Sequence, residues 1–162
     1  MDDFGNIVAD TIAELNAGPD RVRVLARLHD WRDRVHRLYA EIEDGLGAEY
    51  VYDRMGKHRT EESVVQGAGV APSDVPAIDV LRIEAPGGEL RAVIQPRHLW
   101  IVGANGRLDL IVARRSGAGR RLFEIIDMSR PMSGASDWRL VWGGQPLEQP
   151  PFSIERLRAL LE

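Results

Sequence analysis

The most regular hydrophobic pattern in the chain lies between residues 20 and 47. Asp20 can cap the start of a helix there, and Gly45 and Gly47 can end it. Apolar residues follow one another at alternating spacings of four and three, which gathers them on one face of that helix: Val24, Leu28, Trp31, Val35, Leu38 and Ile42. An apolar face this broad needs a second surface to cover it.

Another helix is expected before this one. It carries apolar residues at helical spacing, namely Phe4, Val8, Ile12 and Leu15. Gly18-Pro19 ends it, because proline cannot continue the helical hydrogen bonds. The two helices predict an N-terminal helical pair over residues 1–47. The polar face of the second helix carries pairs such as Asp30 and Arg34, whose spacing is typical of a solvent-exposed surface.

Apolar and polar residues alternate after residue 77, as they do in strands. Turn residues separate the alternating segments, which are 78–84, 89–95, 98–104, 107–113, 121–127 and 137–142. Asn105-Gly106 is the strongest hairpin signal among these turns. Residues 48–77 form a connector with a short strand at Tyr50-Val51-Tyr52, a turn at 55–59 and a short helix.

These segments predict a single α+β domain over residues 1–162. Its parts are the N-terminal helical pair, an antiparallel sheet of about five strands built from hairpins at 78–142, and a C-terminal helix. That last helix follows a loop within residues 143–162, and Ser153 caps it.

Two turns predict which sheet residues share a face. A two-residue turn at Asn105-Gly106 pairs Ile101 with Leu110, and a four-residue turn at 116–119 pairs Leu110 with Ile125. One face is then wholly apolar, with Leu99, Ile101, Leu108, Leu110, Val112, Phe123 and Ile125. The reverse face is mixed, with Trp100, Val102, Asp109, Ile111, Leu122, Glu124 and Ile126.

Composition excludes several classes of protein. The chain has 162 residues, 44% of them apolar, and no cysteine, so it has neither disulfides nor a thiolate nucleophile. No run of about 18 apolar residues is present, and the start lacks a signal-peptide pattern, so a cytoplasmic protein without membrane contact is expected. The formal net charge is −4, and Lys57 is the single lysine beside 20 arginines, as in proteins of GC-rich bacterial genomes.

Two acidic or histidine clusters are candidates for chemistry. Asp109 and Glu124 are diagonal neighbours on adjacent strands in the expected register, where paired carboxylates can act in acid–base catalysis or bind a divalent cation. Nearby arginines could instead pair with them. His29, Asp33 and His36 share one edge of the second helix and are candidate metal ligands, or a polar border beside its apolar face.

Two basic segments are candidates for binding anions or nucleic acid. Arg54, Lys57 and Arg59 follow two tyrosines and precede a helix, where they could contact phosphates. A second group of arginines flanks the turn at 116–119: Arg114, Arg115, Arg120 and Arg121. Either group could equally be a solvated charged surface.

No catalytic motif emerges, and no cofactor is implied. The leading interpretation is a non-enzymatic cytosolic interaction protein, such as an accessory subunit or an antitoxin-like or immunity-like factor. It would bind another protein chain or itself through apolar residues of the helix and of the mixed face: Trp31, Leu38, Trp100, Val102 and Ile111. Two alternatives stay open: a small-molecule-binding domain or enzyme using Asp109, Glu124 and Trp100, and a nucleic-acid-binding accessory protein using the arginine-rich turn.

Overall fold

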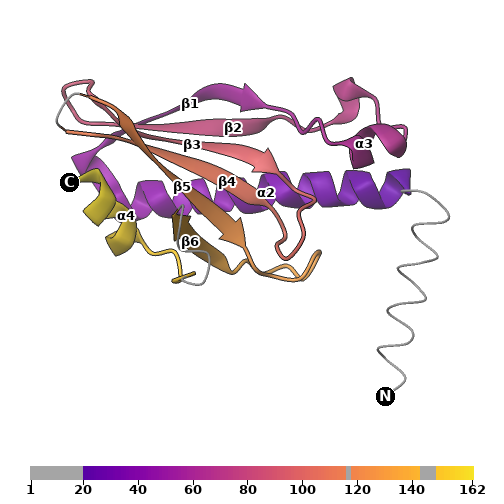
Figure 1. Cartoon of the computed structure of the whole chain (residues 1–162). Helices are drawn as coiled ribbons and strands as arrows, with labels where there is room; N and C mark the ends of the chain where they lie inside the picture. The colour runs from indigo at the N-terminus through magenta and orange to yellow at the C-terminus, as the bar shows by residue number, and fades with distance from the viewer. Residues whose placement is uncertain (1–19, 116–117, 143–148) are drawn as a thin grey trace, which may run out of the picture.

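The computed structural model describes residues 20–115, 118–142 and 149–162. Its helices are α2 (Arg21–Leu46), α3 (Ser63–Gly67) and α4 (Ile154–Leu161), with short 3-10 turns η1 (Gly47–Glu49) and η2 (Pro72–Asp74). Its strands are β1 (Val51–His58), β2 (Ile78–Glu84), β3 (Leu90–His98), β4 (Arg107–Ala113), β5 (Arg120–Asp127) and β6 (Trp138–Trp142). The strands form one antiparallel sheet in chain order, β1-β2-β3-β4-β5-β6 (Figure 1).

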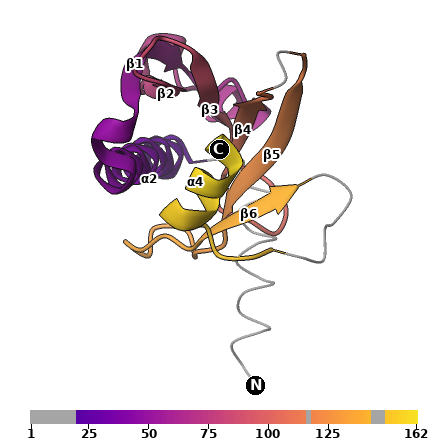
Figure 2. The same ribbon diagram turned by 90° about the vertical axis from the view of Figure 1, so that its left-hand side faces the viewer.

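Helix α2 runs across one face of the sheet, and α4 packs beside it on the same face (Figures 1 and 2). The apolar face predicted for the helix is confirmed, and the chain's own sheet covers it. Residues from both layers share one core and are almost wholly buried, among them Leu28, Trp31, Leu38, Tyr39, Leu81, Ile94, Leu110 and Ile125. Although α2 is 26 residues long, no helix in the described part of the chain is apolar enough to cross a membrane.

The ends of α2 follow the predicted signals with one exception. An Asp20 carboxylate oxygen accepts the Val22 N–H at 2.9 Å, and Gly47 ends the helix in the left-handed region at φ 64°. Gly45 does not end the helix. A Cβ there would lie 2.7 Å from Cγ1 of Ile154, so this glycine lets α4 pack closely against α2.

The α+β class is confirmed, but two parts of the expected arrangement are corrected. The described part of the chain has one long N-terminal helix rather than a pair, and residues of the other expected helix lie outside the described ranges. The sheet has six strands, five of them at 78–142, because segment 98–104 is not a strand; the sixth is β1, to which the expected turn at 55–59 largely belongs. Strand β1 is an edge strand and carries few apolar residues, which explains why the sequence indicated only its beginning, at Tyr50-Val51-Tyr52.

Segments 78–84 and 107–113 are strands with the expected bounds, whereas 98–104 is not a strand. Strand β3 ends at His98, which pairs with Arg107, so residues 99–106 form the connection. Asn105-Gly106 does not act as a two-residue hairpin turn. The Asn105 N–H donates to the Asp127 carbonyl, and Trp31 packs where Gly106 would carry a Cβ.

The register between β4 and β5 also differs from the expectation by two residues. Leu110 pairs with Phe123 rather than Ile125, because the connection after Ala113 spans six residues rather than four. A shift of two preserves the face of every side chain. The apolar face is therefore right for the residues within the strands, which are all buried against the helices: Leu108, Leu110, Val112, Phe123 and Ile125.

Arg34 lies on the helix face that was expected to be solvent-exposed, but it is buried. Its side chain is only 2% exposed, and its Nη1 lies 2.5 Å from Oδ2 of Asp127, which is fully buried. It also donates to Asp30 at 2.8 Å and to the Asn105 carbonyl at 2.9 Å. The spacing of Asp30 and Arg34 indicated their pairing but gave no sign of a third, distant partner.

Candidate functional site

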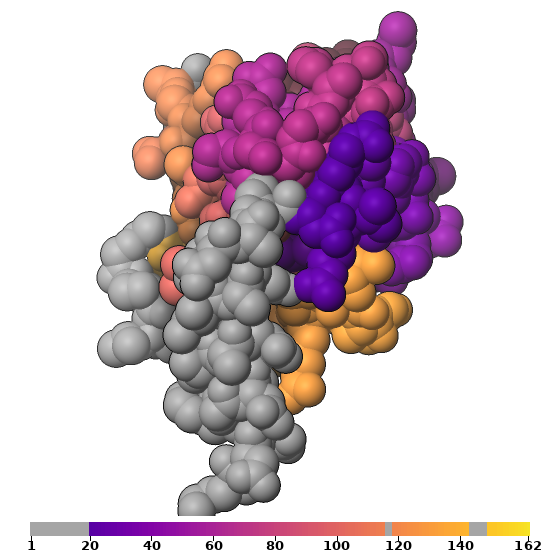
Figure 3. Space-filling view, turned by 90° about the vertical axis from the view of Figure 1, so that its right-hand side faces the viewer, coloured from indigo at the N-terminus to yellow at the C-terminus, as the bar shows by residue number. Residues whose placement is uncertain are grey.

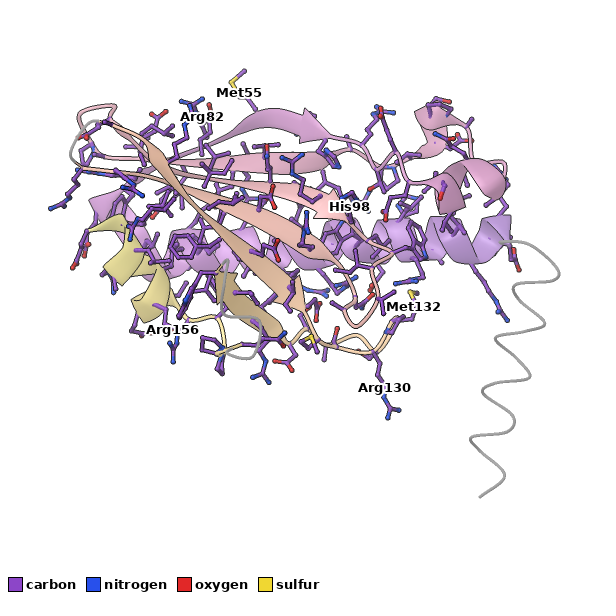
Figure 4. The ribbon with its side chains drawn as sticks, in the orientation of Figure 1. Met55, Arg82, His98, Arg130, Met132 and Arg156 are labelled. Atoms are coloured by element: carbon purple, nitrogen blue, oxygen red, sulfur yellow. The ribbon has the colours of Figure 1, made fainter. Side chains whose placement is uncertain are left out.

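A cavity of about 590 Å³ lies at the end of the sheet where β1 and β3 finish, next to α3. Figure 3 faces this end, with the region around α3 in magenta above the start of α2 in indigo, and Figure 4 marks His98 at the end of β3. The cavity is lined by Lys57, His58, Arg59, Glu61, Glu62, Ser63, Val64, Arg97, His98 and Trp100. Its volume lies in the range of small-molecule sites.

Sheet topology brings the two basic segments of this cavity together. Strands β1 and β3 both pair antiparallel with β2, so they run in the same direction and their C-terminal ends lie at the same end of the sheet. The segments Lys57–Arg59 and Arg97–Trp100 therefore become neighbours, although some forty residues separate them in the chain. Helix α3 follows the first segment and closes one side.

Glu62 fixes the position of the apolar wall. Its two carboxylate oxygens accept the backbone N–H groups of Leu99 at 2.8 Å and Trp100 at 2.9 Å. The Arg27 guanidinium lies 5.1 Å from the centre of the Trp100 ring, and it donates to the Asn105 side chain at 2.9 Å. These contacts hold the indole at the cavity from two sides, and the two N–H groups offset the charge of Glu62.

The three cations of the cavity are each held by an acceptor outside its lining. Lys57 pairs with Asp79, Arg97 donates through Nε to Asp109 at 2.5 Å, and Arg59 donates through Nη1 to the Pro72 carbonyl at 3.0 Å. Within the described ranges, neither terminal nitrogen of Arg97 donates a hydrogen bond to another residue. These N–H groups are available to a bound anion.

His58 contributes a buried ring nitrogen, Nε2, that has no hydrogen-bond partner among the described residues. Burial lowers the pKa of His58 below its usual 6.5, and the neighbouring Arg97 and His98 lower it further, while Glu61 and Glu62 act in the opposite direction. The imidazole is therefore neutral at pH 7, and an anion beside it would favour its protonated form.

The cavity contains residues that the sequence singled out for different reasons. Lys57 and Arg59 were expected to contact anions, and Trp100 was expected to contact a partner. Arg54 does not join them, because its guanidinium forms a bidentate pair with Glu43 at 2.7 and 2.9 Å. The lining residues that the sequence did not single out include Glu62, Arg97 and His98. The segment Arg97-His98-Leu99-Trp100 repeats the basic and aromatic mixture that singled out residues 50–59, and it could have been found by that signal.

The candidate catalytic carboxylates lie elsewhere, on the sheet face opposite α2. Asp109 is directly opposite Glu124 rather than diagonal to it, as the corrected register requires. Arg107 lies 3.3 Å from Glu124 and 3.9 Å from Asp109, and Arg97 takes the remaining side of Asp109. The pair is thus part of an arginine–carboxylate network.

The three candidate metal ligands on α2 are not brought together. His36 accepts the Asp79 N–H through Nε2 at 3.0 Å, Asp33 pairs with Arg32 at 3.0 Å, and His29 is exposed. In the described ranges, no group of three or more histidine, aspartate or glutamate side chains is arranged to hold a metal ion.

The candidate partner-binding residues divide into two sets. Trp31 and Leu38 are at most 1% exposed in the core, so their assignment to a binding surface is wrong. Val102 is fully exposed, and Ile111 is half-buried on the sheet face away from α2.

The four arginines that flank the β4–β5 turn are all exposed: Arg114, Arg115, Arg120 and Arg121. Of these, Arg121 donates to the Leu160 carbonyl at the end of α4.

Comparison with family models, curated proteins and solved structures found no match. Function is therefore inferred from the residues of the cavity and their chemistry.

Proposed function

We propose that the protein is a small-molecule-binding module that holds an organic anion in the cavity between β1, β3 and α3. The observation that carries this proposal is the convergence of Lys57, Arg59 and Arg97 on one cavity, beside the unpartnered Nε2 of His58. Two strand ends supply these groups, and each cation is already oriented by an acceptor behind it.

The charge balance of the lining favours an anion over a cation. Of its three cationic side chains, Lys57 and Arg97 are paired with Asp79 and Asp109 outside the lining, whereas Arg59 donates to a carbonyl oxygen. Of its two carboxylates, Glu62 is already engaged by two backbone N–H groups. Hydrogen bonds from guanidinium groups to carboxylate or phosphate oxygens are short and charge-assisted. In a partly enclosed site they are also screened less than on an open surface.

Isothermal titration calorimetry at low salt tests this proposal with inorganic phosphate, acetate, benzoate and phenyl phosphate. We expect at least one of these anions to bind, and we expect Arg59→Gln to weaken it about tenfold, the usual size of one charge-assisted hydrogen bond. Arg156→Gln is the matched control, because Arg156 is an exposed arginine of α4 outside the cavity and outside both candidate basic segments. The absence of binding by all four anions, or an equal loss in the control, would contradict the proposal.

Protein binding is a second candidate, favoured by an exposed apolar residue in the connection between β3 and β4. Val102 is fully exposed, and Met128 in the neighbouring connection is 42% exposed. The two connections are linked, because the Asn105 side chain lies 3.4 Å from the Ser129 hydroxyl. We propose self-association through the exposed Val102 side chain, with Val102→Asp weakening it. If sedimentation velocity shows only monomer across a wide range of protein concentration, self-association is contradicted.

A further inference from the structure

The cavity between β1, β3 and α3 has two chemically different walls. Lys57, His58 and Arg59 at the end of β1 form a basic wall together with Arg97 and His98 at the end of β3. The second wall is apolar and consists of the Trp100 indole and the Val64 side chain of α3. A ligand that fills the cavity therefore meets charge on one side and an aromatic surface on the other.

The aromatic wall is held in place before any ligand arrives. Glu62 accepts the successive backbone N–H groups of Leu99 and Trp100, and Arg27 of α2 lies over the indole ring. Trp100 packs on the edge of the core yet stays only partly buried. An aromatic side chain that needs little ordering on binding is an efficient stacking surface, because less conformational entropy is lost.

The two walls are close enough to contact a single small molecule. Arg97 and Trp100 are three residues apart, so their Cα atoms are separated by at most roughly 11 Å, three times the spacing of consecutive Cα atoms. Both side chains line the same cavity of about 590 Å³. A charged group attached directly to a ring matches this separation better than a long, flexible molecule does.

We infer that the ligand of this cavity is a planar aromatic ring that carries an oxyanion, a phosphate or a carboxylate. The oxyanion lies among Lys57, Arg59 and Arg97, and the ring lies against Trp100 and Val64. This inference rests on the proposed anion-binding function and adds the chemical class of the ligand. Stacking of a ring on an aromatic side chain contributes up to about a tenfold gain in affinity.

The test compares three phosphates by isothermal titration calorimetry. Phenyl phosphate carries the ring, cyclohexyl phosphate has a similar size without aromaticity, and inorganic phosphate has the charge alone. We expect phenyl phosphate to bind about tenfold more tightly than either of the other two. Benzoate, measured beside phenyl phosphate, shows whether the site prefers a carboxylate or a phosphate.

Two variants of Trp100 locate the aromatic contact. Trp100→Leu keeps an apolar side chain and should bring phenyl phosphate down to the affinity of cyclohexyl phosphate, while inorganic phosphate binds as before. Trp100→Phe keeps a ring and should retain most of the preference. Circular dichroism and thermal unfolding establish that both variants are folded.

The outcomes separate the two proposals. If the three phosphates bind equally, or if Trp100→Leu leaves the aromatic preference intact, the inference about the ring is overturned while anion binding stands. A folded Trp100→Leu variant that loses inorganic phosphate as well also overturns it, because Trp100 would then shape the whole cavity. If no anion binds the unaltered protein, the proposed function itself fails.

Discussion

Arg34 of α2 and Asp127 at the end of β5 form a buried ion pair, with 2.5 Å between Nη1 and Oδ2. Asp127 also accepts the backbone N–H groups of Ser129 at 2.8 Å and Asp137 at 2.9 Å. Arg34 in turn donates to the Asn105 carbonyl in the connection between β3 and β4. The pair thus links the β3–β4 and β5–β6 connections to helix α2. These connections lie near Trp100, because Asn105 also contacts Arg27, which lies over the Trp100 ring.

Removing the charge of Asp127 should destabilise the fold strongly. In Asp127→Asn the buried Arg34 guanidinium loses its closest and fully buried negative charge and keeps, among the described residues, only Asp30, at 2.8 Å, as an ion-pair partner, so we expect a cost of about 3 kcal/mol. Urea unfolding followed by tryptophan fluorescence measures the loss. Asp33→Asn is the control, because Asp33 is exposed and its pair with Arg32 should contribute less than about 1 kcal/mol. Equal stability of the two variants would contradict the role of the buried pair.

The same carboxyl group should make the fold sensitive to acid. Burial alone would raise the pKa of Asp127, but hydrogen bonds from Asp137 and Ser129 and the charge of Arg34 outweigh it and hold the pKa below the usual 3.8. A carboxyl whose pKa is lower in the folded protein stabilises it above the unfolded-state pKa, and this stability is lost as pH falls through the folded-state pKa. Denaturant midpoints measured from pH 7 to pH 2 should therefore fall below about pH 4, and less steeply in Asp127→Asn.

Ligand binding should take up a proton at His58. Burial and then the nearby Arg97 depress its pKa in the free protein, and a bound anion raises it, so affinity should fall as pH rises between the two values. Benzoate is a suitable probe, because a carboxylate stays ionised from pH 5.5 to pH 8. Calorimetry in buffers of different ionisation enthalpy measures the proton uptake directly.

The charged groups around His58 set the control for this experiment. Arg97 and His98 disfavour its protonation, and Glu61 and Glu62 favour it. His58→Gln should abolish both the proton uptake and the pH dependence while anion binding persists. His29→Gln, at an exposed histidine of α2, should leave both unchanged. Proton uptake that survives in His58→Gln would assign the titration to another group.

Sequence periodicity predicted the layers of this fold better than its connections. The spacing from Val24 to Ile42 reports a buried helix face directly, and side-chain alternation gave the correct face for Leu110 even with the register wrong by two. The cavity could not be predicted in the same way. It depends on β1 and β3 finishing at the same end of the sheet. Because β1 is an edge strand with many polar residues, it lacks a clear alternation of apolar and polar positions.

A glycine is needed at position 106 for a different reason from the one that its Asn-Gly sequence suggests. Asn-Gly usually marks a hairpin turn, but here φ is 118° and a Cβ would lie 2.3 Å from Cζ3 of Trp31. Gly106→Ala should therefore destabilise the protein by about 3 kcal/mol, through both backbone strain and overpacking. Gly88→Ala separates the two effects, because Gly88 has φ 91° with open space around it, and should cost about 1 kcal/mol. Chemical unfolding of both variants checks the difference.

Glu61 and Glu62 offer a matched pair for testing how the cavity discriminates between ligands. Both carboxylates line it, but only Glu62 holds the backbone of Leu99 and Trp100. Glu61→Gln removes a negative charge without removing the contacts to Leu99 and Trp100, so inorganic phosphate and phenyl phosphate should both bind a few-fold more tightly. Glu62→Gln removes the same charge and also weakens the clamp on Trp100. It should improve inorganic phosphate binding but reduce the preference for phenyl phosphate to less than about threefold. Calorimetry with both ligands measures these four affinities, and identical behaviour of the two variants would show that Glu62 acts through its charge rather than by positioning Trp100.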